Sequence, residues 1–213
     1  MKKLAAFLVL FIFLCGCDGQ ELKFKTFEPT SLSPDMKVFQ KDNLTYVEYQ
    51  SKKYKVTVSL FEYQNFFIAP VEIDNLTNSD IATREYSIGL FDGRDYLPIK
   101  MLPIENLRSI QAGLNGGSPA FSYDSPEKAL QTAVASILEK VQPSSKKAAA
   151  EGLERLIGEY YAFRPVYANE TRKGLLAFLL DFPLEYPLSV IVKLKGERID
   201  FHFMPSTEGV PID

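Results

Sequence analysis

Residues 65–80 read NFFIAPVEIDNLTNSD, and this stretch is the most informative about the fold class. Apolar residues recur at every second position, which is the period of a β-strand with one apolar face: Phe67, Ala69, Val71 and Ile73. Pro70 lacks a backbone donor, so we expect it at a sheet edge or a bulge. The polar run NLTNS that follows predicts the turn that ends the strand.

Shorter stretches with strand character lie on both sides of this run. Asp92-Gly93 and Lys195-Gly196-Glu197 each predict a tight reversal between two strands. We therefore expect about eight short, mostly antiparallel strands, with further strand segments at 44–49, 54–63, 86–100, 162–167, 170–182 and 187–204. The polar residues 206–213 are expected to form a frayed tail.

The middle of the chain changes to a helical period. Ser125 is placed to cap a helix whose first helical residue is Pro126, and Pro143 ends the pattern. A second helix begins after Ser144, with an apolar side: Ala149, Leu153, Leu156, Ile157 and Tyr160. These patterns predict a helical hairpin inserted at about residues 104–160, between the early and late strands.

The strands and the inserted hairpin together favour a mainly β fold, a two-sheet β-sandwich. The order of PVEIDNLTNS, a later KGLLAFLL strand and a final hairpin ending IDFHFMP resembles the immunoglobulin-like domains of uncharacterised bacterial envelope lipoproteins. The resemblance covers residues 43–205. It implies a fold and no activity.

The first twenty residues, MKKLAAFLVLFIFLCGCDGQ, have the organisation of a secretion signal. Two lysines precede an uncharged apolar run over 4–14, which is shorter than the roughly 20 residues that span a bilayer. Cys15 and Cys17 are the only cysteines, and with the single histidine they cannot complete a four-ligand zinc site.

Leu14-Cys15-Gly16-Cys17 resembles the bacterial lipobox. The resemblance implies cleavage after Gly16, so that 1–16 is a signal peptide, and a diacylglycerol thioether on Cys17, which becomes the N-terminus. Asp18 resembles the signal that retains lipoproteins in the inner membrane. The alternative is a plain cleaved signal or an uncleaved anchor.

By this resemblance the chain is anchored to a membrane of the bacterial cell envelope on its extracytoplasmic side, with the periplasmic face of the inner membrane favoured. Residues 17–42, which contain Pro29 and Pro34 and have no sustained period, are expected to form a lipidated tether that packs only in part.

The mature chain would hold 22 basic and 27 acidic residues, because Lys2 and Lys3 leave with the signal. With a net negative charge and no basic run, nucleic acid is not an expected partner.

No arrangement of residues selects a reaction. His202 is the only histidine, and its place between Phe201 and Phe203 indicates a surface or sheet-edge residue. The DGRD stretch at 92–95 lacks the ligand spacing of a calcium loop, and GLNGG at 113–117 precedes no Lys-Ser or Lys-Thr pair. No metal, cofactor or catalytic residue is therefore assigned from the sequence.

Two further patterns have a structural and a functional interpretation. The sequons at Asn43, Asn75 and Asn169 are interpreted as turn and strand-end asparagines. Seven aromatic residues within 46–67 form either core and cross-strand pairs or an exposed strip for a protein or a glycan: Tyr46, Tyr49, Tyr54, Phe61, Tyr63, Phe66 and Phe67.

These observations favour a non-catalytic, lipid-anchored envelope protein that binds or supports an envelope protein partner. Two alternatives stay open. One is an envelope glycan hydrolase that uses a pair of carboxylates about 5 to 9 Å apart. The other is a carrier of a lipid or small ligand, which needs an apolar cavity.

Overall fold

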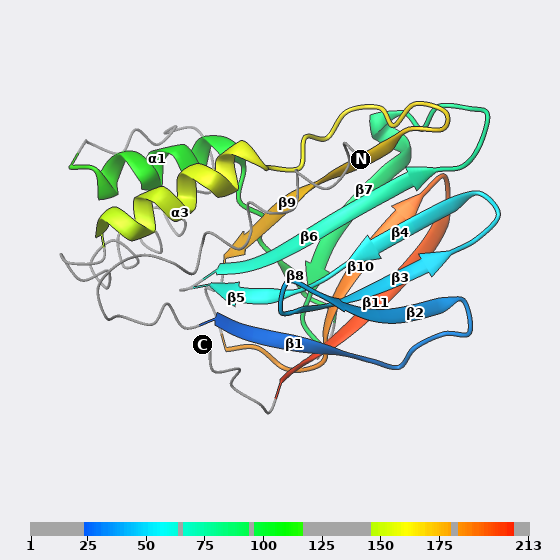
Figure 1. Cartoon of the computed structure of the whole chain (residues 1–213), viewed down its shortest axis with the longest axis horizontal. Coiled ribbons are helices and arrows are strands. Elements are labelled where there is room, and N and C mark those ends of the chain that lie inside the picture. The colour runs from blue at the N-terminus through cyan, green and yellow to red at the C-terminus, as the bar shows by residue number, and fades with distance from the viewer. Residues whose placement is uncertain (1–23, 64–65, 94–95, 117–145, 180–182, 207–213) are drawn as a thin grey trace. The chain divides into compact units, whose positions relative to one another are not determined.

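The computed structural model describes residues 24–63, 66–93, 96–116, 146–179 and 183–206, and this part of the chain is mainly β-structure (Figure 1). The chain divides into two compact units. The described residues within 20–101 and 161–213 form a β unit, and those within 102–160 form a helical unit. The expectation of a mainly β chain with helices between early and late strands is confirmed.

The described strands of the β unit pair only in antiparallel fashion. There are eleven of them in the described ranges: β1 Phe24–Thr30, β2 Met36–Lys41, β3 Leu44–Gln50, β4 Tyr54–Val58, β5 Phe61–Tyr63, β6 Phe66–Asn75, β7 Tyr86–Phe91, β8 Pro98–Ile99, β9 Thr171–Leu179, β10 Leu188–Leu194 and β11 Glu197–Pro205. A short 3-10 helix, η2, covers Thr83–Glu85.

Strand β6 is the centre of one part of the sheet. It pairs with β4 and β5 along one side and with β9 along the other. From there the sheet continues through β3 to β2, its edge strand among the described residues. On the other side of the unit, β11, β10, β7 and β8 follow one another.

Strand β1 joins these two parts because it changes partner halfway along (Figure 1). Residues 24–26 pair with β5, and residues 27–30 pair with β11. A strand that turns from one set of neighbours to another does not keep one apolar face, which explains why its sequence shows no sustained period.

The expectation that Pro70 lies at a sheet edge or a bulge is wrong, because Pro70 lies within the central strand β6. Ser59 donates its N–H to the Pro70 carbonyl at 3.1 Å, but Pro70 has no N–H to return the bond. The ladder is therefore interrupted between β4 and β5. The register on either side is unchanged, so no residue is inserted and the site is not a bulge.

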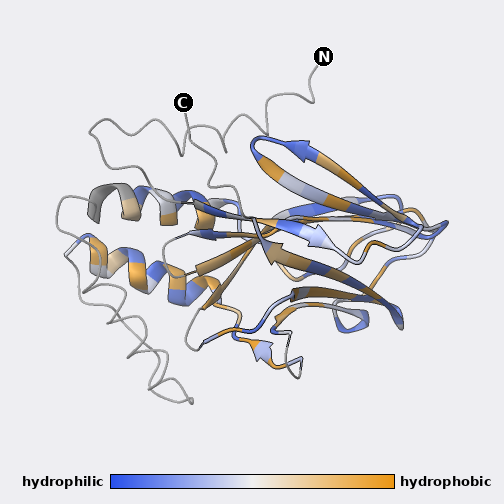
Figure 2. Cartoon of the chain, turned by 90° about the horizontal axis from the view of Figure 1, so that it is seen from below, coloured by the Kyte–Doolittle hydropathy of each residue, from blue (hydrophilic) through white to orange (hydrophobic). Residues whose placement is uncertain are grey.

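The core of the β unit is made by the predicted apolar faces, and Figure 2 shows long hydrophobic stretches along the strands. Six of the seven clustered aromatics are buried, which contradicts the exposed-strip interpretation for them and supports the core interpretation: Tyr46, Tyr54, Phe61, Tyr63, Phe66 and Phe67. Tyr49 is half-buried and donates to Glu197 Oε1 at 2.6 Å.

The helical unit contains α1, Ile104–Leu114, and α3, Lys146–Gly158, which contact each other. Each buries an apolar side, through Leu107 and Ile110 on α1 and through Leu153 and Leu156 on α3. The second predicted helix is confirmed by α3. Helix α1 was not predicted, and the helix expected from Ser125 lies outside the described residues.

Two other sequence predictions differ from the structure. Residues 162–167 form a loop with one isolated bridge, because Pro165 and neighbouring side-chain contacts replace a strand ladder. Strands β1 and β2 lie inside residues 17–42, where a tether was expected. The sequence missed β2 because five of its six residues are exposed, which removes the alternation of buried and exposed positions.

Candidate functional site

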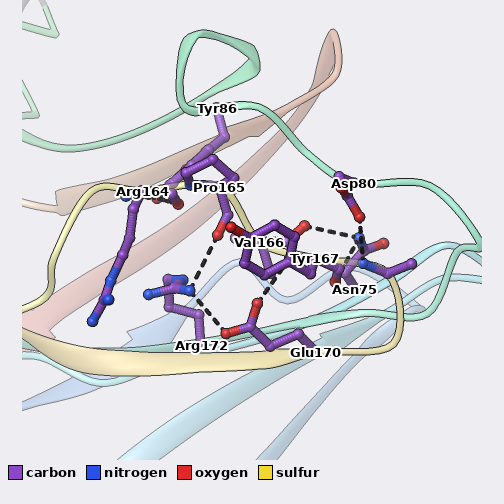
Figure 3. Close-up of polar contacts among 10 residues, drawn as sticks. Asn75, Asp80, Tyr86, Arg164, Pro165, Val166, Tyr167, Glu170 and Arg172 are labelled. Atoms are coloured by element: carbon purple, nitrogen blue, oxygen red, sulfur yellow. Dashed lines mark hydrogen bonds and ion pairs between the residues drawn. The ribbon is translucent and has the colours of Figure 1, made fainter.

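The end of β6 carries a dense set of polar contacts (Figure 3). Asn75 closes the strand and is 1% exposed. Its Nδ2 donates to the carbonyls of Ser79 at 2.8 Å, Val166 at 3.2 Å and Tyr167 at 3.1 Å. Its Oδ1 accepts bonds from the backbone and side chain of Thr77 at 3.1 and 2.7 Å. One side chain thereby holds two loops distant in sequence.

We call these loops, residues 76–82 and 161–170, the braced loops. A short bridge joins them directly, because Ile81 and Val166 exchange both backbone hydrogen bonds, at 2.9 and 3.0 Å. Beside it, Ala168 donates its N–H to Asp80 Oδ1 at 2.9 Å. Ordered backbone contacts of this kind are unusual for surface loops, which are commonly mobile.

Arg172, the second residue of β9, holds the other side of loop 161–170 (Figure 3). Its Nη2 donates to the Pro165 carbonyl at 3.1 Å and pairs with Glu170 Oε1 at 2.8 Å. Its side chain is 10% exposed, so this ion pair is shielded from solvent much more than a surface pair. Glu170 also accepts the Tyr167 N–H through Oε2, at 2.8 Å.

Tyr86 also holds loop 161–170, and Tyr161 is the first residue of that loop. The Tyr86 hydroxyl donates to the Arg164 carbonyl at 2.8 Å and accepts the Arg164 N–H at 3.2 Å. Burial raises the pKa of Tyr86, and it raises the pKa of Tyr161 further. Both hydroxyls therefore stay protonated at neutral pH and do not act as bases.

The braced loops present exposed apolar groups on a fixed backbone. Tyr167 is 57% exposed and Leu76 is 44% exposed, although the loop backbone around each is hydrogen-bonded. The Leu76 N–H donates to the Lys53 carbonyl at 2.9 Å, so the exposed β3–β4 turn lies beside them. Lys195 reaches the same place through its Nζ, 3.0 Å from Ser79 Oγ.

This arrangement suits recognition of another molecule. A rigid tyrosine offers a large amphipathic contact area at low entropic cost, and aromatic residues are enriched at the centres of interfaces. Exposed lysines at the rim add charge without desolvation. The arrangement offers no nucleophile next to a base among the residues that Figure 3 labels.

The sequence pointed to part of this site only. The NLTNS turn and the strand-end position of Asn75 were predicted, and Asn75, Asn43 and Asn169 all lie at strand ends or turns, as expected. The roles of Arg172 and Glu170 were missed, since the bonds that tie this ion pair to the loop go to the Pro165 carbonyl and the Tyr167 N–H, which no sequence pattern encodes.

The other residues singled out from the sequence lie elsewhere. Cys17 and Asp18, the predicted lipidation and sorting residues, lie outside the described residues. His202 is half-buried on β11, and its Nδ1 lies 2.8 Å from Oγ of its cross-strand neighbour Ser189. Because Ser189 is 2% exposed, a substrate would not reach its hydroxyl, and the pair is a structural contact.

Asp92, from the DGRD stretch, is buried at the end of β7, and its N–H donates to the Leu97 carbonyl at 3.0 Å, which agrees with a reversal. In the described ranges no three of the histidine, cysteine, aspartate and glutamate side chains are grouped as a metal site. No helix there is long and apolar enough to cross a membrane.

Comparison with protein-family models, with curated proteins and with solved structures gave no significant match.

Proposed function

We propose that this chain is a non-catalytic, lipid-anchored protein of the bacterial cell envelope that binds a protein partner through its braced loops. The anchor is the diacylated Cys17 implied by the lipobox resemblance, with Asp18 favouring the inner membrane. Acylation with two or more chains is enough for stable membrane attachment.

The observation that carries the proposal is the position of the loops relative to the first strand. Phe24, where β1 begins, pairs with Tyr63, which in turn pairs with Phe66 at the start of β6. The braced loops lie at Asn75, the other end of the same strand, about 30 Å away at roughly 3.3 Å per residue. A chain anchored just before β1 would therefore carry the loops on the side away from its attachment.

The finer fold assignment is part of the same proposal. Strand β1 pairs with β5 by one half and with β11 by the other, which is how a strand contributes to both sheets of a sandwich. We infer a two-sheet β-sandwich of immunoglobulin-like type. In such folds the loops at one end commonly carry the binding residues, and here those are the braced loops.

The test is cross-linking in native cells, recovery of the chain and mass spectrometry of the attached proteins, with wild type compared with Tyr167→Ser. Tyr96→Ser is the matched control, because Tyr96 is 50% exposed and lies in the loop between β7 and β8. The proposal expects one envelope protein to be recovered with wild type and with the control, but several-fold less with Tyr167→Ser. Equal recovery with both variants contradicts it.

The anchor is tested separately by replacing Cys17 with alanine. The proposal expects loss of acylation and a shift of the protein from the detergent phase to the aqueous phase. A variant that partitions like wild type contradicts the lipid anchor but leaves the loop proposal standing.

A further inference from the structure

Strand β2 is an edge strand with an exposed outer side. In the described part of the chain it pairs only with β3. Val38 is 41% exposed and Phe39 is 39% exposed, so the strand presents apolar side chains as well as a backbone edge. Such edges pair readily with a further strand unless something blocks them.

Along β2, residues that hydrogen-bond to β3 alternate with residues that do not, and this alternation shows which backbone groups face outward. Gln50 donates its N–H to the Asp35 carbonyl at 3.1 Å, which makes residue 35 a hydrogen-bonded position toward β3. In an antiparallel ladder these positions alternate, so residues 37, 39 and 41 also bond to β3. The N–H and C=O of Val38 and Gln40 therefore point away from the sheet, together with the Met36 carbonyl.

We propose that β2 pairs antiparallel with β2 of a second copy of this chain, about a twofold axis that passes beside Val38. This interaction surface is separate from the braced loops. In this register Val38 faces Val38 of the second copy, and Met36 faces Gln40 of the second copy. Four intermolecular backbone hydrogen bonds then form: each Val38 N–H bonds the other Val38 carbonyl, and each Gln40 N–H bonds the other Met36 carbonyl.

Charge selects this register over its neighbours. Because only alternate residues of β2 present backbone groups outward, the registers between the two copies that keep the hydrogen bonds differ by steps of two residues. With the axis at Val38, Asp35 faces Lys41 of the second copy, and Lys37 faces the Phe39 ring of the second copy, which permits a cation–π contact. With the axis at Phe39, Lys37 would face Lys41, and with the axis at Lys37 the two Lys37 side chains would face each other. Both alternatives place like charges directly opposite, which is destabilising.

The side chains on the two faces suit the pairing. Phe39 already stacks on Tyr46 of β3, with ring centroids 5.5 Å apart and planes at 11°. Lys37 of the second copy would lie beside Phe39, so that Tyr46, Phe39 and this lysine form one row across three strands. The Met36 N–H is not needed, because it bonds the Ser33 carbonyl at 3.0 Å within its own turn. The turn therefore remains intact in the dimer.

The first test is the oligomeric state of the full-length chain in detergent, measured by sedimentation velocity over a range of protein concentrations. We expect a reversible dimer. Lys41→Glu should weaken it by about tenfold or more, since it creates two like-charge contacts with Asp35. Lys193→Glu on β10 is the matched control for net charge and should leave the dimer unchanged.

The double variant Asp35→Lys/Lys41→Glu restores opposite charges at both contacts, and we expect it to restore the dimer. Val38→Pro should abolish it without unfolding the chain, because the Val38 N–H makes no bond to β3. A wild-type chain that stays monomeric at every concentration overturns the proposal. A dimer that survives both Lys41→Glu and Val38→Pro overturns it equally, since that dimer would use another surface.

Discussion

The braced loops are irregular and firmly held, whereas strand β2 is regular and lightly held. Loop 161–170 is fixed by Asn75, Arg172 and the bridge to Ile81, so most of its contacts come from elsewhere in the chain. Strand β2 bonds to one neighbour and exposes five of its six residues. Local rigidity in this molecule therefore follows buried polar contacts and not regular secondary structure.

The side-chain contacts that hold the braced loops, made by Asn75, Arg172 and Glu170, are here called the brace. The largest expected effect on stability is from removing its central side chain, Asn75. Asn75→Ala removes five hydrogen bonds, three from its Nδ2 to backbone carbonyls and two from Thr77 to its Oδ1. We expect the free energy of unfolding to fall by about 3 to 4 kcal/mol, measured by urea denaturation. Asn78→Ala, an exposed position in the same loop, should change it by less than about 0.5 kcal/mol. Similar losses for the two variants would contradict the brace.

A buried tyrosine outside the brace separates the effect of burial from that of the loop contacts. Burial raises the pKa of Tyr63 to about 12 from its ordinary value of 10. Its contribution to stability is therefore complete below pH 10 and is lost as the pH rises from 10 to 12. Between pH 10 and 12 the free energy of unfolding should therefore fall by about 2 to 3 kcal/mol less in Tyr63→Phe than in wild type, measured by denaturation across this pH range. An unchanged pH profile would show that Tyr63 does not titrate in this way.

Arg172 supplies a smaller part of the brace. Arg172→Met keeps much of the side chain's volume but removes the bonds to Pro165 and Glu170, and we expect a loss of about 1 to 2 kcal/mol. Arg198→Met is the control, because its ion pair with Asp200 at 2.7 Å involves an arginine side chain that is 50% exposed. The control should cost less than Arg172→Met, because an exposed ion pair is screened by solvent. Equal costs would mean that the Arg172 pair is no more than a surface contact.

The smallest effect is expected on β2. Val38→Thr keeps a β-branched side chain at an exposed position, so the stability of the monomer should change by less than about 0.5 kcal/mol. Val56→Thr on β4 is the buried counterpart, at 0% exposure, and should cost about 1 to 3 kcal/mol. A large loss at Val38 would mean that β2 is covered.

The sequence was most informative where side chains alternate between a core and a surface. It predicted β3, β6 and the β10–β11 hairpin, and Lys195 and Gly196 adopt the positive φ angles of 45° and 86° that a tight hairpin turn requires. It failed for β1, whose partners change midway, and for β2, which is exposed on both faces. The brace was only partly predictable, because its bonds join side chains to backbone groups some ninety residues away.

The most direct test of this comparison is amide hydrogen exchange of the full-length chain, followed residue by residue at low protein concentration. The Ile81 and Val166 amides, which form the bridge between the braced loops, should exchange at least about 100-fold more slowly than the outward-facing Val38 and Gln40 amides. At high concentration Val38 and Gln40 should become protected as β2 pairs with a second copy. Fast exchange at Ile81 and Val166 would show that the braced loops are not rigid.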